Sequence, residues 1–178
     1  GGGDFVSMPI CYEKNREHYD VDEVDKKKKK DVTIPEVASR IESHLDKFEN
    51  KTAEVHFEET KTTSGYRTEC EKIWKEDGYP VNTTHDPADN KTAKMDRIKN
   101  HAPDIRKLHF VDMKNQSKEY RKYFQNILYC NYDGKMKHDD GVDSTAQLCD
   151  MIYGSKRKVA KVEAVSNPFR TGGYTHGF

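Results

Sequence analysis

The sequence predicts an α/β protein in which a mixed β-sheet is flanked by helices on both faces. Two observations support this fold class. The chain contains two kinds of stretch, which follow one another in turn. In one kind apolar and polar residues alternate, and in the other apolar residues recur at helical spacing. The chain has 178 residues, enough for one domain whose core buries roughly two-thirds of the unfolded surface.

A β-hairpin is expected at the start of the chain. Residues 5–13 and 18–24 read as two strands, and the turn-rich segment KNRE joins them. A run of lysines follows at residues 26–30. Such a run indicates either a solvated loop or a contact with an anionic backbone.

The segment TIPE at residues 33–36 predicts the start of the first helix. Thr33 supplies a hydroxyl at the N-cap, Pro35 suits the first turn, and Glu36 stands three residues after the cap. The apolar residues that follow have helical spacing: Val37, Ile41, Leu45 and Phe48. We therefore expect an amphipathic helix here.

The remaining elements alternate in type. Strands are expected at residues 53–57, 80–84 and 108–111, and helices at residues 64–77, 91–100, 119–132 and 139–153. The helical periodicity is lost after Gly154. We therefore expect one domain over residues 1–154 and a flexible or partner-docking tail over residues 155–178.

Composition narrows the classes of function. Lys plus Arg and Asp plus Glu balance at 31 each, so binding to nucleic acid would need local patches or bound cations. The chain has no phosphate-binding loop motif of NTPases, no apolar run of about 18 residues and no secretory leader, which predicts a soluble protein with no membrane contact. Its cysteines are far apart, which argues against a thiolate zinc site and favours a reducing, intracellular setting: Cys11, Cys70, Cys130 and Cys149.

Two groups of acidic residues indicate a site. Glu58 ends a strand that is expected to lie in the middle of the sheet, and sheets of this class place their sites at such strand ends. Asp139, Asp140 and Asp143 crowd the start of the last helix in the segment HDDGVD, behind His138. The helix dipole explains one aspartate at a helix start, but it explains three poorly.

A divalent cation would make this crowding of carboxylates favourable. A site in which every ligand atom is an oxygen favours Mg²⁺ or Mn²⁺. If Glu58 converges on Asp139, Asp140 and Asp143, two ions roughly 3.5–4 Å apart could clamp the attacking and leaving oxygens of a phosphodiester. Asp4, after three glycines, is a further candidate ligand, unless the glycines are only a flexible tag remnant. An Asp, a Glu and an Asp pair in this order around a mixed sheet suggest a ribonuclease-H-like (RNase H-like) nuclease.

The sequence also resembles the C-terminal nuclease domain of the large terminase subunit, the DNA-packaging motor protein of tailed bacteriophages. The resemblance covers residues 1 to about 154. It is carried by GGGDFVSMPICY with HYDVDEV, by VHFEETKTTSGY, by KTAKMDRIKNHAP followed by LHF, and by KHDDGVDSTAQL. The last of these motifs is the most specific, and the four occur in the order typical of the family.

The resemblance implies an RNase H-like fold and an endonuclease that cuts concatemeric double-stranded viral DNA with Mg²⁺ or Mn²⁺. Glu58 matches the family's second acid, Asp140 its third with Asp139 beside it, and Asp143 an additional acid. Asp4 matches the acid after the glycine loop. The implied partners are double-stranded DNA, the portal protein, the small terminase subunit and an ATPase domain that this chain does not contain. The implied location is the host cytoplasm, at the procapsid portal.

The chain departs from the family pattern at one place. The family's first catalytic aspartate normally lies on a strand ahead of the glycine loop, and this chain starts inside the loop. Either Asp4 takes the metal-bridging role, or a first strand and a key ligand lie upstream. The second option would leave the sheet short of its central strand.

Four cations are candidates for contacts with the DNA backbone, with an ordinary solvated helix face as the alternative: Lys91, Lys94, Arg97 and Lys99. Two other functions remain open. One is a non-catalytic docking or DNA-holding module of the packaging motor, in which the acids are structural. The other is a different RNase H-like nuclease such as a junction resolvase, although resolvases are usually basic dimers and this chain is neutral.

Overall fold

The computed structural model confirms an α/β protein with a mixed sheet and helices on both faces. It describes residues 5–27, 29–48, 52–59, 64–87, 93–131 and 139–165. For residues 5, 25, 27, 59 and 155–165 it describes the backbone alone. None of the helices in these ranges has the length and apolar content needed to cross a bilayer.

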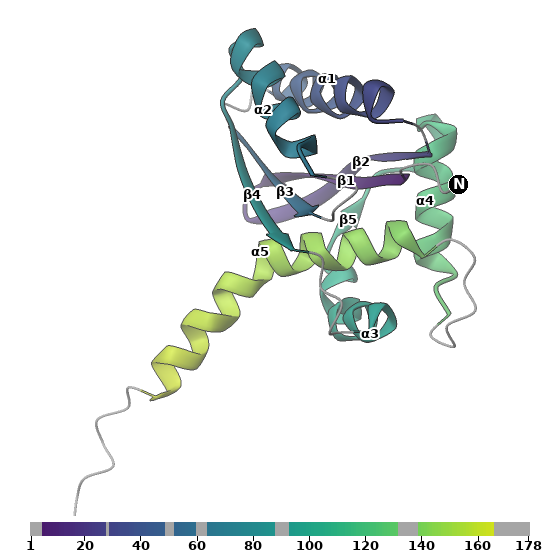
Figure 1. Ribbon diagram of the computed structural model, residues 1–178. Coiled ribbons are helices and arrows are strands. Elements are labelled where there is room, and N and C mark those ends of the chain that lie inside the picture. Colours follow the sequence, from purple (N-terminus) through teal and green to yellow (C-terminus); the bar gives the residue numbers. More distant parts are fainter. Residues whose placement is uncertain are drawn as a thin grey trace, which may run out of the picture.

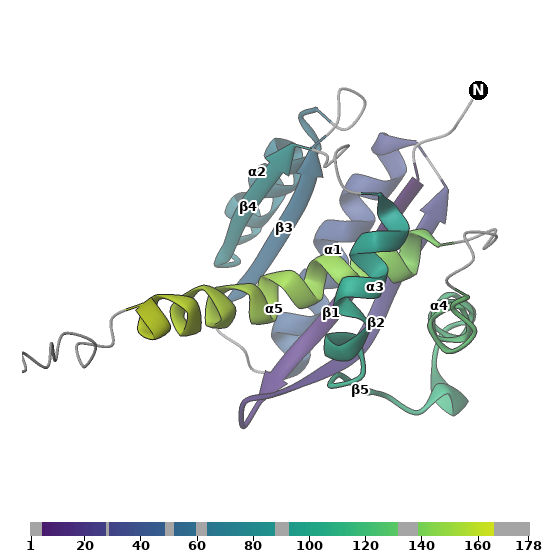
Figure 2. The same cartoon turned by 90° about the horizontal axis from the view of Figure 1, so that it is seen from below.

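The sheet consists of two parts. In the first, β1 (Phe5–Lys14) pairs antiparallel with β2 (Glu17–Lys27), and β2 pairs parallel with the short β5 (His109–Phe110). In the second, β3 (Ala53–Glu59) pairs parallel with β4 (Val81–Pro87). In the described chain no backbone ladder joins β1 to β3, although Figure 2 shows the two parts side by side.

Helices cover both faces of these strands (Figure 1). On one side lie α1 (Lys30–Phe48) and α2 (Tyr66–Asp77). On the other side lie α3 (Lys94–Ile105), α4 (Lys118–Leu128) and α5 (Asp140–Val165). A single 3₁₀ turn, η1 (Met113–Asn115), leads into α4.

The larger core lies under α1 and α2. Trp74 is 1% exposed, and its indole N–H donates to the carbonyl of Ala38 over 3.2 Å. Val24 from β2, Val55 from β3 and Cys70 from α2 belong to the same cluster. A smaller core lies on the opposite side of the sheet, under α5, around Ile105, Leu108, Ala146 and Cys149.

The bounds of several elements differ from the prediction. The first helix begins at Lys30, so Thr33 is not its N-cap. Thr33 is instead buried in the first turn, where its hydroxyl donates to the carbonyl of Lys29 over 3.3 Å. The lysine run is not one solvated loop, because Lys26 belongs to β2 and forms ion pairs with Glu36 and Glu119. A buried threonine and a neutralised lysine both depend on tertiary neighbours.

The last helix is longer than expected. It continues through Gly154 to Val165, eleven residues into the segment that was predicted as a tail. Gly154 lies within this helix, beside the exposed side chain of Asp150 from the preceding turn. The rest of the predicted tail, residues 166–178, lies outside the described residues.

Candidate functional site: a groove between two half-sheets

A groove of about 1190 Å³ separates β1 from β3. The strands form its two long walls, while residues of α1 and α5 close it from the two faces of the sheet. Figure 2 shows α5 crossing the space between β1 and β3, with α1 behind it. Every acidic residue that the sequence predicted for the site, among those described, lies at or near this groove.

Glu58 lies at the carboxyl end of β3, as expected. It is exposed and lines the groove. The alternation of the strand explains its direction, since Val55 and Phe57 pack into the core under α1 and α2 while their neighbours point away from it. Glu54 lines the groove nearer the start of the same strand.

Asp140 and Asp143 line the same groove from the start of α5. Asp139 precedes the helix, and its carbonyl accepts a hydrogen bond from the Asp143 N–H over 2.9 Å, so it occupies the N-cap position. Gly141 lets the helix start approach α4, because a Cβ there would lie 3.0 Å from the ring of Tyr123. The structure thus brings Glu58 and two of the three predicted aspartates to one cavity.

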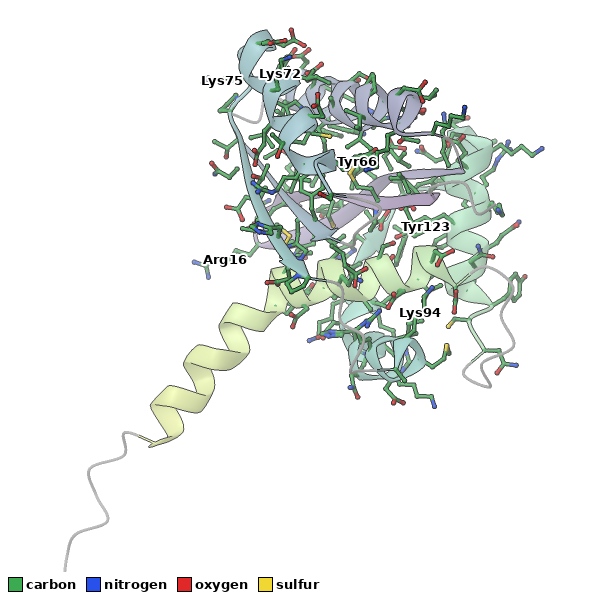
Figure 3. All side chains as sticks on the ribbon, in the orientation of Figure 1. Arg16, Tyr66, Lys72, Lys75, Lys94 and Tyr123 are labelled. Carbon is green, nitrogen blue, oxygen red and sulfur yellow. The ribbon has the colours of Figure 1, made fainter. Side chains whose placement is uncertain are left out.

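Two cations from α3 pair with the three aspartates (Figure 3 shows Lys94 beneath the start of α5). Lys94 Nζ donates to Asp139 Oδ1 over 2.8 Å and to Asp140 Oδ1 over 2.6 Å. Arg97 binds Asp143 with two parallel hydrogen bonds, Nε to Oδ1 over 3.1 Å and Nη2 to Oδ2 over 2.7 Å. The crowded carboxylates therefore have partners within the protein.

The contact of Arg97 with Asp143 is more buried than the contact of Lys94 with Asp140. The Asp143 and Arg97 side chains are 10% and 18% exposed, whereas that of Asp140 is 51% exposed. Burial acts to lower the pKa of Lys94, but its hydrogen bonds with Asp139 and Asp140 outweigh this and raise the pKa above its ordinary value. Lys94 is therefore held in its charged form beside the exposed end of the groove.

The spacing of charges along the chain contains a signal for these pairs. Lys94 and Arg97 are three residues apart, as are Asp140 and Asp143, so each pair lies on one face of its helix. Packing α3 alongside α5 aligns the two faces. Matching spacing of opposite charges predicts a contact between two helices as readily as it predicts a metal site or a DNA contact.

The fit of a divalent cation depends on the exposed acids. Glu58 and Asp140 present oxygen donors at the groove, which is the ligand chemistry that Mg²⁺ and Mn²⁺ prefer. Within the described ranges, no three His, Cys, Asp or Glu side chains are grouped closely enough to hold an ion. A metal at the groove would therefore draw on Glu58 and Asp140 and compete with Lys94 for the latter.

Three predicted site residues lie outside the described residues, namely Asp4, His138 and Lys91. Lys99 is described and is exposed on α3. Of the four cations predicted to contact DNA, Lys94 and Arg97 thus carry internal ion pairs and Lys99 faces solvent.

A second group of acids, which the sequence analysis did not single out, is buried on β2. Asp20 and Glu23 are both 0% exposed. A shift of register opposite Ile10 and Cys11 leaves Val21 without a strand partner, so Asp20 and Glu23 both face the α4 and α5 side. Without this bulge, an odd spacing of three residues would place them on opposite faces.

The buried acids are tied to the helices that carry the site. Tyr123 Oη lies 2.5 Å from Asp20 Oδ2 and 2.9 Å from Thr145 Oγ1. Ser7 donates to Glu23 over 2.7 Å and lies 2.9 Å from the hydroxyl of Ser144. Polar contacts therefore connect β1 and β2 to the first turns of α5.

Burial strongly affects the ionisation of Asp20. Burial raises its pKa to about 7, against the lowering effect of hydrogen bonds with Tyr123 and Tyr120 and with a smaller increase from Asp22.

No protein-family model, no curated protein and no solved structure matches the chain.

Proposed function

We propose that the chain is an RNase H-like, Mg²⁺- or Mn²⁺-dependent endonuclease domain that cleaves double-stranded DNA. One observation carries the proposal. Glu58 from β3 and Asp140 and Asp143 from the start of α5 line one groove, although they are far apart in the chain. A shared groove with carboxylates from a strand end and a helix start is suited to holding a hard cation beside a phosphodiester.

The arrangement of strands supports the same class of fold. The antiparallel β1 and β2 are followed by α1, and then by parallel strands β3 and β4 that flank α2 in sequence. The groove divides the sheet next to β1, which is where the absence of a central strand would leave a gap. The packaging nuclease of the large terminase subunit is the member of this class that the sequence resembles.

The chain's own residues would act in distinct ways. Glu58 and Asp140 would hold the ion, which when bound supplies a Lewis acid for phosphodiester hydrolysis. Lys94 donates hydrogen bonds to Asp139 and Asp140 and so would hold both carboxylates in position at the start of α5. Arg97 holds Asp143 in place with a bidentate contact, and so fixes the first turn of α5.

DNA would reach the groove from the side on which α3 presents its cations. Lys99 is exposed on this helix and is suited to contact a phosphate, which would position the duplex without reading its sequence. In a packaging motor, the portal protein, the small terminase subunit and an ATPase domain would be the partners, at the procapsid in the host cytoplasm. These partners are proposed from the resemblance alone.

A plasmid-nicking assay tests the proposal. The wild-type chain is incubated with supercoiled plasmid and Mn²⁺, Mg²⁺ or EDTA. Glu58→Gln and Asp140→Asn remove one proposed ligand each. Glu54→Gln and Asp150→Asn are matched controls, because they remove the same charge from the same strand and the same helix at other positions.

We expect nicking in Mn²⁺ by the wild type and both controls, and a loss of at least about 100-fold in the two ligand variants, since metal sites supply several kcal/mol of transition-state stabilisation. Binding gives a second readout. Mn²⁺ at 100 times its dissociation constant should stabilise the wild type by about 2.7 kcal/mol and the ligand variants by much less. Equal nicking or equal stabilisation in all five proteins would contradict the proposal.

A second function is favoured by the ion pairs. Since Lys94 and Arg97 already pair with all three aspartates, the acids could serve only to dock α5 against α3. The chain would then be a non-catalytic module that holds DNA or a partner in the motor. Retarded migration of DNA without nicking, combined with no stabilisation by Mn²⁺, would support this function over the endonuclease.

A further inference from the structure

The lysine run at residues 26–30 and the start of α4 lie at the same end of the molecule. Lys26, near the end of β2, binds Glu36 in α1 and Glu119 in the first turn of α4, the latter over 3.5 Å. Figure 1 shows the end of β2, the start of α1 and α4 beside one another. The tertiary structure therefore brings together two basic segments that are far apart in the chain.

All the cations of α4 lie in its first two turns and on one face. Lys118, Arg121 and Lys122 have the spacing of three and four residues that places side chains together on a helix, and all three are exposed. The helix carries a single acid, Glu119, which binds the lysine run through Lys26. The exposed face of α4 is therefore cationic, on a chain whose total charges balance.

The stability of the helix does not explain this distribution of charge. The amino end of a helix is the positive end of its dipole and favours acids, whereas cations are favoured in the last turn. α4 has the reverse arrangement, since Lys118 is its first residue and its last turn contains no basic residue. A negative charge outside the protein would make the arrangement favourable, because the cations and the dipole would attract it together.

One residue of the lysine run adds to this face. Lys26 is occupied by its ion pairs, whereas Lys29, directly ahead of α1, is exposed. We name the exposed cations at this end of the molecule the α4 surface: Lys29, Lys118, Arg121 and Lys122. None of these four residues lines the groove between β1 and β3, so the α4 surface is separate from the proposed metal site.

Double-stranded DNA is the polyanion that fits this surface best. Its phosphates present one negative charge per about 1.7 Å of helix axis, and separate cations on a helix face can contact them from outside a pocket. A membrane fits less well, because a helix on a bilayer places its apolar face in the lipid. The apolar face of α4 is already inside the protein, where Tyr120 and Tyr123 are 0% and 1% exposed.

We propose that the α4 surface binds the phosphate backbone of double-stranded DNA and holds the duplex beside the start of α5. The two helices are in close contact there, since a Cβ on Gly141 would lie 3.0 Å from the ring of Tyr123. Phosphate contacts position a duplex without reading its sequence. The choice of DNA rests on the proposed function, but binding at this surface requires neither a metal ion nor cleavage.

The test measures DNA binding in EDTA, by fluorescence anisotropy of a short labelled duplex at salt concentrations between about 50 and 200 mM. The double variant Lys118→Gln with Arg121→Gln removes two charges from the α4 surface. Lys72→Gln with Lys75→Gln is the matched control, because these exposed lysines are also three residues apart on one helix. Figure 3 shows both of them on α2, well away from α4.

The salt dependence of binding gives the expected result. Each phosphate contact contributes about 0.9 to the slope of the logarithm of the binding constant against the logarithm of salt concentration. The α4 double variant should reduce the magnitude of this slope by about 1.8, and Lys29→Gln added to it by up to about 0.9 more. The α2 control should keep the wild-type slope. The Tm of the α4 double variant should not fall, since the change removes cations that oppose the helix dipole.

Three outcomes would overturn the proposal: equal slopes for the wild type and the α4 double variant, equal losses in this variant and the α2 control, or no binding of the duplex by the wild type. Vesicles of anionic lipid and polyglutamate are tested with the same proteins. If the α4 double variant loses binding to either of these and keeps its slope for DNA, the partner is a membrane or an acidic protein and the proposal is wrong.

The plasmid-nicking assay keeps this proposal distinct from the proposed function. If the wild type nicks plasmid in Mn²⁺ while the α4 double variant binds DNA with the wild-type slope, the α4 surface is not the DNA contact and the endonuclease proposal stands. If the slope falls as expected and the wild type does not nick, the α4 surface binds DNA and the endonuclease proposal fails.

Discussion

At the scale of single residues, the buried carboxyl of Asp20 couples the strands to the start of α5. Thr145 donates its hydroxyl hydrogen to the carbonyl of Gly141 over 2.7 Å, and so it is free to accept one from Tyr123. In the structure Tyr123 donates its hydroxyl hydrogen to Asp20 Oδ2; protonation of Asp20 would let the carboxyl donate to Tyr123 instead, and all three hydroxyl hydrogens would then have acceptors. This arrangement agrees with the direction in which burial moves the pKa of Asp20.

The stability of the protein should therefore fall as Asp20 ionises. Its pKa of about 7 in the folded state lies above the usual 3.8, so between about pH 4 and pH 7 the folded state holds a proton that the unfolded state has lost. Raising the pH through this window removes that stabilisation. We expect Asp20→Asn to reduce this pH dependence. The stability of the variant relative to the wild type, measured by urea denaturation, should be greater at pH 8 than at pH 5.

Asp22, on the same strand, is a control of opposite sign. Burial acts to raise its pKa, but hydrogen bonds from His44 and Arg40 outweigh this and hold the pKa below its usual value. Its stabilising contribution is present above the unfolded pKa and is lost as the pH falls through the folded pKa. Asp22→Asn should thus lower stability at neutral pH and reduce the loss on acidification. A common pH profile for both variants would contradict these assignments.

The ion pair between Arg97 and Asp143 gives a further prediction. Asp143→Asn should lower the free energy of unfolding by about 3 kcal/mol or more, because it removes the buried negative charge that the Arg97 guanidinium binds with two hydrogen bonds. The double variant Arg97→Met with Asp143→Leu should recover most of this loss. Asp140→Asn, in the exposed contact with Lys94, should cost less than about 1 kcal/mol. Equal losses at Asp140 and Asp143 would show that burial does not separate the two contacts.

At the scale of elements, the ends of α2 illustrate local control by sequence. Gly78 ends the helix with φ +80°, and its N–H bonds to the carbonyl of Trp74. Nothing lies within 4 Å of a Cβ placed there, so the backbone conformation alone requires glycine. The predicted end of this helix at Asp77 was correct for this reason.

Gly78→Ala should lower the free energy of unfolding by about 1–2 kcal/mol, which is the cost of the left-handed conformation for a residue with a Cβ. Gly78→Asn should cost less, since asparagine tolerates this conformation. Chemical denaturation of the two variants provides the measurement. If alanine and asparagine were equally destabilising, a steric contact would be the cause instead.

At the scale of the whole molecule, the split sheet should be visible in its unfolding. β3, α2 and β4 form one unit, and they contact the rest through the core under α1; among the described residues no strand ladder joins this unit to the other strands. Hydrogen bonds that cross a continuous sheet normally make it open as one cooperative unit. Here that connection is missing between β1 and β3.

Native-state hydrogen exchange at increasing denaturant should therefore resolve two sub-global openings in the 178-residue chain, with the amides of β3 and β4 opening at a lower free energy than those of β1 and β2. The smaller unit has fewer strands and a shorter ladder, so it should open first. A single opening free energy for all four strands would mean that packing through α1 is sufficient to make the sheet cooperative.

Sequence by itself determined what depends on neighbours along the chain. Alternation and helical spacing identified the strands and helices, because burial of one face imposes these periods locally. Sequence also identified Glu58 at a strand end and Asp139 at the start of a helix. It did not locate the start of α1, where Thr33 is buried and bonds to the carbonyl of Lys29 instead of capping the helix, or the end of α5.

Only the tertiary structure decided which charges meet and what separates the strands. Lys94 and Arg97 were expected to face DNA, but α3 packs against α5 and the aspartates there offer nearer counter-charges. Asp20 reads as an ordinary polar position on a strand, and a bulge together with two helices buries it. The groove between β1 and β3 depends on strand order, which long-range pairing sets and local periodicity does not record.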